Sequence, residues 1–458
     1  MSLNYDDSNS LEMSTNYDDT NSFDMSAKDD NPNELLPTTQ PCLVDVGVHA
    51  WTTLFGAWLA IAATFGYTFT FGIYQDVYAR ADVASATGVR WIGATQLSVL
   101  LATSLPAGLL HDSGHFRSVV TLGSYLFTFS YVRSSYRKLC TLFTAGGHGR
   151  LFMLSLIDLK DHYLKFFFTQ GIVMGVAAGL VCIPSLAVQA HHWGPRSTLA
   201  MGIASTGLFF GGTFFTIMLN QLLQHGVSFA WTVRVSSFVV LGMLLVANTC
   251  MRRSCPRVEP LKGDKRASMR ELVTDAPFMC VAIGGLFMNW GIYFVFSYLQ
   301  QYVIDAGMNR AFAVYTPAIL CGAAVLGGIL SNLVATKYGT INAFTYTALP
   351  CTILILMVIP TSISGVAVLA TISGFPTGAW LSLLPPALRT TSTSTRDCGV
   401  RLGLGFAMSA VAVPAGTLVN NWLLGPAPQF EWGLPAMLVM GAGVLLCVTA
   451  QYIMRHDC

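Results

Sequence analysis

Two apolar stretches decide the class of this protein: FFFTQGIVMGVAAGLVCIPSLAVQA at residues 166–190 and STLAMGIASTGLFFGGTFFTIMLN at residues 197–220. Neither contains a charged residue, and each can cross about 30 Å of hydrocarbon as a helix that rises about 1.5 Å per residue. Only HHWGPR, residues 191–196, lies between them. This joint leaves no room for a soluble domain, so we expect the two helices to cross in opposite directions and lie side by side.

Both stretches carry small residues at helical spacings. In lipid the packing of side chains must replace the hydrophobic effect, and small residues let helix backbones approach closely. The sequence therefore predicts a polytopic helical membrane protein. The small residues are Gly171, Gly175, Ala178 and Gly179 in the first stretch, and Gly202, Ser205, Gly207, Gly211 and Gly212 in the second.

The composition agrees with this class. Only 10% of the 458 residues are charged and 53% are hydrophobic, which leaves too little charge to cover a soluble surface. The net charge of +2 gives no reason to expect a nucleic-acid partner, and lipid is the expected surroundings. The eleven cysteines occur singly, so we interpret them as small core residues. No phosphate-binding loop, dinucleotide fingerprint or metal-ligand cluster occurs, and no cofactor is expected.

The apolar runs predict an all-α fold of twelve transmembrane helices in two six-helix halves. The first half, residues 45–251, follows an acidic tail, residues 1–44, that we expect to be disordered and cytosolic. A basic cytosolic linker, residues 252–276, leads to the second half, residues 277–458. The expected spans are 50–74, 91–110, a broken third span from Ser118, 166–190, 197–220, 231–251, 277–303, 311–335, 341–360, 365–387, 402–421 and 433–453.

The distribution of Lys and Arg predicts the orientation. The linker is rich in basic residues, and basic residues concentrate on the cytosolic side of membrane proteins. We therefore place both termini in the cytosol, and we expect the plasma membrane, with the vacuolar membrane as the alternative. The basic linker residues are Arg252, Arg253, Arg257, Lys262, Lys265, Arg266 and Arg270.

The third span is interrupted by a polar segment. Residues 118–130 and 151–157 together make one span if residues 131–150, which carry four basic residues, are lifted out. We interpret residues 131–150 as an insertion, such as an unspliced in-frame intron. The alternative is a long outer loop with a shifted helix.

Short motifs add a family resemblance. The segment DVGVHAW at 45–51 resembles the opening motif of the monocarboxylate porter family of the major facilitator superfamily, and of its fungal branch above all. The resemblance covers roughly residues 45–455 and implies solute transport by alternating access, with the site near the membrane midplane. The further matches are at residues 65–67, 71–76, 91–93, 96–97, 108–117, 167–171, 184–188, 200–205 and 401–403.

The departures from the family pattern bear on the substrate. Val46 replaces the usual Gly, Ser113 the usual Arg, and Thr336 the usual Asp. Gly328 stands where the family commonly has an Arg that is thought to bind the substrate carboxylate. A carboxylate in low dielectric needs a fixed cation, and no charged residue lies well inside any span. Arg234 lies near a span end, where it can reach the interface.

We therefore predict a central cavity without formal charge, lined by aromatic and amide side chains. Asn289 is the candidate we favour, because a lone amide inside an apolar helix needs a partner or a polar cavity. For the others, helix packing or lipid contact is the competing interpretation. The candidate substrate-binding residues are Phe65, Tyr67, Phe69, Gln170, Asn289, Tyr293, Phe294 and Trp380.

Charged residues near the span ends are the candidates for gating. We assign Asp45, Asp112, Arg117 and Arg401 to this role, with interfacial anchoring as the alternative. Proton coupling needs a titratable group that both sides reach in turn. The spans contain no buried carboxylate, so Asp45, Asp112 and the pair His191/His192 are the nearest candidates.

Three classes of function remain. The first is a secondary transporter for a small organic solute: a monocarboxylate-like compound, or a neutral or weakly acidic metabolite, including a metabolite efflux pump of a biosynthetic pathway. The second is a non-transporting sensor or defective splice product of such a transporter. The third, a membrane enzyme, would need ionisable groups clustered at one depth, and no such cluster occurs. We expect a transporter and no enzymatic activity.

Overall fold

The computed structural model describes residues 47–80, 85–132, 163–252, 269–305, 307–355, 362–391, 397–423 and 434–456. These residues fall within one compact unit, Val44–Cys458. The predicted tail, residues 1–44, and all but the first two residues of the predicted insertion, 131–150, lie outside the described part. All the regular structure in the described part is helical.

The first half contains six crossings. A π-helical turn (η1), Ala62–Gly66, and a turn at Phe69 and Thr70 interrupt the first crossing, and a second π-helical segment (η3), Phe167–Val173, lies in the fourth. The crossings are α1 (Val48–Ile61) with η1 and α2 (Phe71–Arg80); α3 (Ala86–Asp112); α4 (Phe116–Val132); α6 (Tyr163–Phe166) with η3 and α7 (Met174–Ala187); α9 (Ser197–Gln224); and α10 (Phe229–Cys250).

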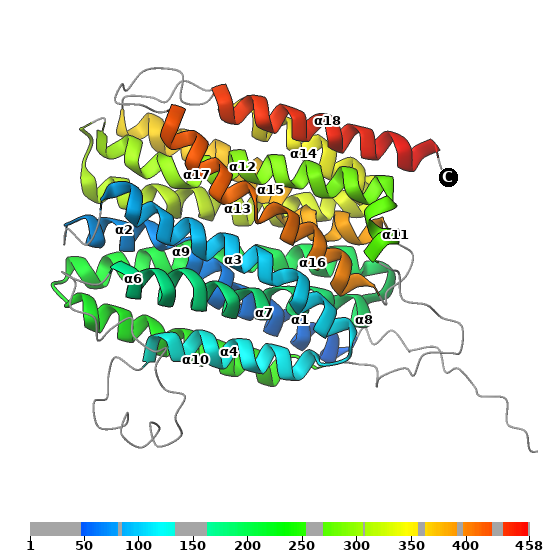
Figure 1. The fold of residues 1–458 in the computed structure, drawn as a ribbon, viewed down its shortest axis with the longest axis horizontal. Helices are drawn as coiled ribbons and strands as arrows, with labels where there is room; N and C mark the ends of the chain where they lie inside the picture. The colour runs from blue at the N-terminus through cyan, green and yellow to red at the C-terminus, as the bar shows by residue number, and fades with distance from the viewer. Residues whose placement is uncertain are drawn as a thin grey trace, which may run out of the picture. The chain divides into compact units, whose positions relative to one another are not determined.

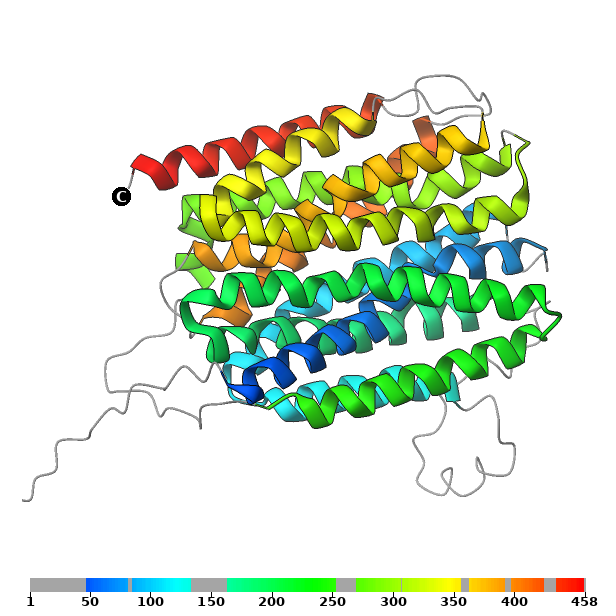
Figure 2. The ribbon, with the colours of Figure 1, turned by 180° about the vertical axis from the view of Figure 1, so that it is seen from behind.

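The second half repeats the plan. A short helix, α11 (Met269–Thr274), precedes it, and a break at Ala410 and Val411 divides its fifth crossing. Its six crossings are α12 (Ala276–Asp305), α13 (Arg310–Tyr338), α14 (Thr340–Ile355), α15 (Ile363–Thr390), α16 (Cys398–Ser409) with α17 (Ala412–Leu423), and α18 (Leu434–His456). Figures 1 and 2 show the helices of the two halves as two neighbouring groups of long rods.

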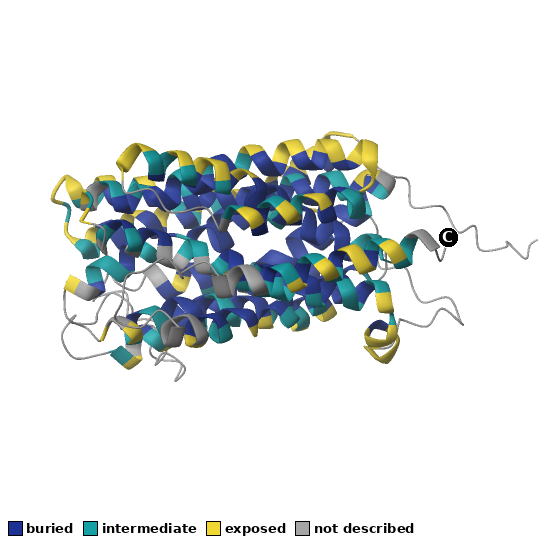
Figure 3. Cartoon of the chain, turned by 90° about the horizontal axis from the view of Figure 1, so that it is seen from above, coloured by how far each residue is buried: buried dark blue, intermediate teal, exposed yellow. Residues whose placement is uncertain are grey.

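The length and surface of these helices suit a bilayer. Within the described residues, nine helical segments are long and apolar enough to cross a membrane. Buried residues fill the interior and exposed ones occupy the outer faces (Figure 3). Many exposed side chains are large and apolar, which favours contact with lipid. Examples are Leu122, Leu245, Leu326, Leu445 and Val448.

The residues of the decisive sequence hairpin fold as two long crossings, as predicted. The joint is more ordered than we expected: a short helix, α8 (Gln189–Trp193), and a 3₁₀ turn, Gly194–Arg196, connect them. Gly194 has a backbone φ of +46°, a conformation that residues other than glycine rarely adopt.

The small residues of this hairpin pack against other helices than we expected. A Cβ added at Gly175 would lie 2.7 Å from the Gln96 carbonyl oxygen of α3, and one added at Gly212 would lie 3.0 Å from the Cys321 sulfur of α13. Close packing is therefore confirmed, but it joins the fourth crossing to α3, and the fifth to α13 and to the first crossing, rather than to each other.

The two halves meet mainly along two pairs of helices. The helix α3 packs along α16, and α9 packs along α13. We call the end of the bundle at which α3 ends and α16 begins the linker end, because α11 and Met251 lie there too. We call the opposite end, where α9 ends and α13 begins, the loop end.

Candidate functional site: a central cavity between the two halves

A cavity with about 680 Å³ of space free of protein atoms lies between the two halves. This volume counts all the space between the walls, including space that is open to solvent. Helices of the first half (α1, α3, α7, α9) and of the second (α12, α15, α16, α17) form its wall. Among the residues that the structure describes, no Lys, Arg, Asp or Glu lines it.

The wall is mostly aromatic and aliphatic. The aromatic residues are Phe65, Phe69, Tyr293, Phe296 and Phe406, the polar ones are Cys182, Ser205 and Asn289, and the rest are aliphatic. The rings of Phe69 and Phe296 meet across the halves with centroids 4.6 Å apart, nearly edge to face. This surface favours an apolar ligand, which a few polar groups can orient.

Irregular helix geometry in the first crossing places two of these rings. Phe65 lies in the π-helical turn η1, and Phe69 lies in the turn that follows it. A π-helical turn shifts the register of the side chains that follow, and such turns occur frequently at functional sites. Close contact of Gly66 with α9 fixes this turn: a Cβ there would lie 2.7 Å from the Gly211 Cα.

Four of the predicted substrate-binding residues line this cavity: Phe65, Phe69, Asn289 and Tyr293. Asn289 lies on α12, and its amide nitrogen donates to the Gly285 carbonyl oxygen at 2.9 Å and to Ser409 Oγ at 3.2 Å. The lone amide thus has both partners and a cavity. The side chain of Phe294 lies outside the described part.

Three other predicted residues are not among the described residues that line this cavity. The Tyr67 hydroxyl bonds to Tyr74 and to Ser236 Oγ within the first half. Gln170 accepts a hydrogen bond of 2.7 Å from the Tyr78 hydroxyl. Each of these groups satisfies a partner on another helix, so both residues have a packing role.

Trp380 is the third residue outside the cavity. Its ring is fully buried and stacks on Phe344 of α14, with centroids 5.0 Å apart. We predicted it from its position in the tenth crossing, but it faces α14 within the second half rather than the first half.

Asp112 closes the linker end between the halves. Its two carboxylate oxygens accept hydrogen bonds from the backbone N–H groups of Gly399 at 3.0 Å and Val400 at 2.8 Å. These N–H groups belong to the first turn of α16, where a helix attracts negative charge. The backbones also touch, since a Cβ added at Gly403 would lie 2.6 Å from the Ser104 carbonyl oxygen.

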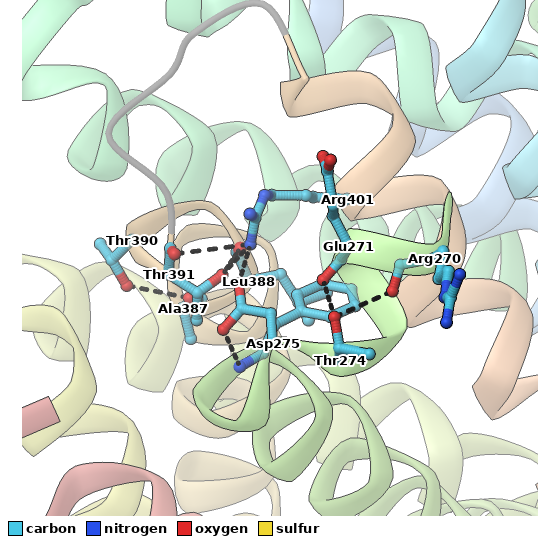
Figure 4. A network of polar contacts seen from close by, with 10 residues as sticks. Arg270, Glu271, Thr274, Asp275, Ala387, Leu388, Thr390, Thr391 and Arg401 are labelled. Atoms are coloured by element: carbon cyan, nitrogen blue, oxygen red, sulfur yellow. Dashed lines mark hydrogen bonds and ion pairs between the residues drawn. The ribbon is translucent and has the colours of Figure 1, made fainter. Parts of the chain in front are cut away.

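Arg401, another predicted gating residue, pairs with Asp275, and no described hydrogen bond or ion pair joins it to Asp112. Its Nη1 lies 2.8 Å from Asp275 Oδ2 and donates to Thr391 Oγ1 at 3.0 Å (Figure 4). The guanidinium also lies 5.4 Å from the centre of the Phe278 ring. Arg401 thus ties the beginning of α16 to the beginning of α12 and the end of α15, all within the second half.

Two other predicted gating and coupling residues, Arg117 and His192, show no contact with Asp112 among the described residues. Arg117 is exposed on α4, and no hydrogen bond or ion pair joins it to Asp112 among the described residues. Asp45 lies outside the described part. His192 Nε2 lies 2.6 Å from the Arg252 carbonyl oxygen at the linker end, away from the cavity.

Weaker contacts close the loop end. The Gln221 amide donates to the Tyr315 hydroxyl at 2.9 Å, and the Gln300 amide to the Gly72 carbonyl oxygen at 3.5 Å. Both bonds join the first half to the second. Contacts between the halves therefore lie toward both ends of the cavity, and those at the linker end are the stronger.

Sequence reasoning missed Ser409 and Asp275. Ser409 is fully buried and is recognisable only as the partner of Asn289, 120 positions away. Asp275 carried a local signal, because an Asp directly before a long apolar run is a common helix N-cap. Its side chain faces the Phe278 N–H at 3.5 Å, as a cap of α12 would.

The fold is that of the major facilitator superfamily. The crystal structure of FucP in the outward conformation aligns with a TM-score of 0.60 over 87% of this chain and 98% of that one, at 15% identity. A second structure, of the E. coli fucose:proton symporter FucP, aligns with a TM-score of 0.59. The predicted fold of twelve helices in two halves is confirmed, and the chain is an integral multi-pass membrane protein.

Fungal transporters are similar along most of the chain. It is 29% identical over 421 residues to the aspyridones efflux protein apdF of Emericella nidulans, covering 91% of this chain and 80% of that protein. It is 27% identical to the MFS-type transporter dbaD of the same species, and 26% identical to the agnestins efflux protein AgnL12 of Paecilomyces divaricatus. These relatives support a place among the major facilitator transporters. No protein-family model matches the chain.

Proposed function

We propose that this protein is a secondary transporter that exports a neutral or weakly acidic, largely apolar metabolite by alternating access. The observation that carries the proposal is the cavity between the two halves, since none of the described residues that line it is Lys, Arg, Asp or Glu. Moving an unpaired carboxylate into such surroundings is costly, whereas an apolar ligand gains from leaving water.

The closures at the two ends support alternating access. Asp112 joins the halves at the linker end, and the bond between Gln221 and Tyr315 joins them at the loop end. If one set breaks while the other holds, the cavity opens to one side at a time. The halves can then rock against each other around a central ligand.

The relatives support efflux and a secondary metabolite as cargo, since two of them are named for the export of aspyridones and agnestins. Within the superfamily, the motifs at residues 45–51 and 108–117 support the monocarboxylate porter branch. A small anion such as lactate is not the substrate we propose. Gly328 provides no cation where that branch commonly has an Arg, and a Cβ there would already lie 2.9 Å from Thr206.

We propose that a proton gradient drives transport. The neighbour FucP is named as a proton symporter. In the described helices, carboxylates occur near helix ends and not around the cavity. Asp112 lies at such an end, between the halves, where opening would expose it to water. We therefore expect coupling to act through the closure rather than through the ligand.

Transport into inside-out vesicles tests the proposal. The full chain is expressed in a yeast strain that lacks its main export pumps, and the vesicles are offered a panel of neutral fungal metabolites together with lactate. We expect saturable uptake of at least one neutral compound, faster with an imposed proton gradient and not with lactate. Saturable lactate uptake alone, or no uptake of any compound, would contradict the proposal.

A pair of variants distinguishes a loss of transport caused by the cavity wall from one caused by lower protein stability. Phe65→Ala removes a ring from the cavity wall, whereas Phe344→Ala removes a buried ring that stacks on Trp380 away from it. Each change is expected to cost about 3–5 kcal/mol of stability. Transport per molecule in the membrane should fall only in the Phe65 variant.

A further inference from the structure

The orientation of the Asn289 amide is fixed by its partners. Its nitrogen donates to the Gly285 carbonyl oxygen, which can only accept, so the nitrogen and oxygen of the amide cannot be exchanged. The same nitrogen donates to Ser409 Oγ at 3.2 Å. The Ser409 hydroxyl in turn donates to the Gly405 carbonyl oxygen at 3.3 Å, which leaves its lone pairs for Asn289.

These bonds determine which atom of the amide a ligand meets. Both hydrogens of the amide nitrogen are directed to the preceding turn of α12 and to α16. The side chain is half-buried on the cavity wall, so its carbonyl oxygen Oδ1 is the atom left for a ligand. A carbonyl oxygen accepts hydrogen bonds and donates none.

We propose that Asn289 selects neutral ligands that present an O–H or N–H group to its Oδ1, with Ser409 as the positioning residue that holds the amide in this orientation. A flat aromatic compound with a phenolic hydroxyl has the required chemistry, because the surrounding rings of Phe65, Phe69 and Phe296 favour its apolar faces. The inference rests on the proposed function, since it takes the cavity as the substrate site.

The same geometry disfavours carboxylates. A carboxylate carries only acceptor oxygens, which Oδ1 would repel, and none of the described lining residues supplies a positive charge. The other polar lining residues have little effect on this discrimination against carboxylates. Ser205 donates its hydroxyl hydrogen to the Met201 carbonyl oxygen at 2.8 Å within its own helix. Tyr293, one helical turn beyond Asn289, is the competing hydroxyl, and the experiment includes it.

Three naphthalene probes of nearly equal size test the proposal on the full chain in lipid nanodiscs. They are 2-naphthol, which has a donor; 2-methoxynaphthalene, which has none; and 2-naphthoate, which is an anion. Binding is measured as the displacement of radiolabelled 2-naphthol, with empty nanodiscs as the background. We expect 2-naphthol to bind about five- to tenfold more tightly than its methyl ether, as one hydrogen bond predicts, and 2-naphthoate to bind most weakly.

Variants identify the atom responsible. Asn289→Leu keeps the volume and removes the acceptor, so the ratio of the two neutral affinities should fall to about one. Ser409→Ala should lower the ratio although Asn289 remains. Ser185→Ala is the matched control, because that buried hydroxyl also donates to its own helix, at 2.7 Å to the Val181 carbonyl oxygen, and Ser185 is not among the described lining residues. It should leave the ratio unchanged.

The outcomes separate the inference from the proposed function. If all three probes bind alike, or if Tyr293→Phe and not Asn289→Leu abolishes the preference, the role of Asn289 is wrong while the cavity stands as the binding site. An equal loss in the Ser185 and Ser409 variants would reduce Ser409 to a structural residue. If none of the probes binds, the inference and the assignment of the cavity fail together.

Discussion

Replacing Asp112 with Asn should open the linker end. The carboxylate accepts from two backbone N–H groups, those of Gly399 and Val400, at the first turn of α16. The amide of the variant keeps one acceptor and turns its nitrogen toward the second N–H group. Fold and helices should persist, because the contact lies between the halves and at the end of α3.

The magnitude follows from the bonds lost. A hydrogen bond to a charged group contributes about 1.5–3 kcal/mol, and a charge at a helix N-terminus about 0.3–1 kcal/mol. Asp112 is only partly buried, so we take about 2 kcal/mol for the loss. Since about 1.4 kcal/mol is a factor of ten, the linker-open population should rise roughly thirtyfold.

A native cysteine reports this change. Cys182 lines the cavity and is a free thiol, so we would replace the other cysteines with alanine and label Cys182 with a charged, membrane-impermeant methanethiosulfonate. Labelling from the linker side should accelerate with the population that is open there. Vesicles of both orientations distinguish the two sides.

The control is Asp76→Asn. Asp76 pairs with Arg80 at 2.6 Å within a single helix, so its loss should not affect the contact between the halves. A labelling rate for Asp112→Asn within twofold of the parent, or an equal rise for Asp76→Asn, would refute the role of Asp112 as the bond that closes this end.

Three further changes have defined outcomes. Gly108→Ala should also accelerate labelling of Cys182 from the linker side, although alanine favours the helix, because the added Cβ would collide with the Gly399 carbonyl of α16. Arg401→Ala leaves Asp275 without its cation and should lower the free energy of unfolding by about 2–4 kcal/mol, seen as a lower thermal midpoint. Asn332→Ala removes a buried amide that donates to the Gly328 carbonyl oxygen at 2.7 Å, and it should lower the free energy of unfolding by about 1–3 kcal/mol in the same assay. An unchanged thermal midpoint for Arg401→Ala or Asn332→Ala would contradict the structural role of that residue.

The sequence predicted the crossings well because their length is set by the bilayer. Apolar runs near twenty residues mark helices wherever they occur, and the fourth and fifth crossings begin and end close to the predicted residues. Part of the cavity was also predictable. An amide in an apolar helix needs a polar partner, and this reasoning led to Asn289 without any knowledge of its neighbours.

The direction of each side chain was not predictable to the same degree. Phe65 and Tyr67 are two residues apart in the first crossing, yet one lines the cavity and the other bonds to Ser236 inside the first half. Residues i and i+2 of a helix face different sides. Which side meets the cavity depends on packing against α9, where a Cβ at Gly66 would lie 2.7 Å from Gly211 Cα, far away in sequence. Arg401 shows the same limit: its partner Asp275 is 126 positions away, and proximity to a span end alone did not distinguish it from Asp112.

The two closures differ in strength, and this difference predicts which side opens first. At the linker end a charged carboxylate bonds to a helix N-terminus. At the loop end Gln221 and Tyr315 form a neutral, exposed hydrogen bond that competes with water. Tyr315→Phe removes that bond and should raise labelling of Cys182 from the loop side by no more than about fivefold, against roughly thirtyfold for Asp112→Asn from the linker side. A protein closed more firmly at the linker end must break the Asp112 contact to admit cargo from that side. Because protonation would neutralise the same carboxylate, the step that costs most is also the one that a proton can assist. If Tyr315→Phe has the larger effect, the order of closure is reversed, and Asp112 is no longer the group through which a proton gradient would act.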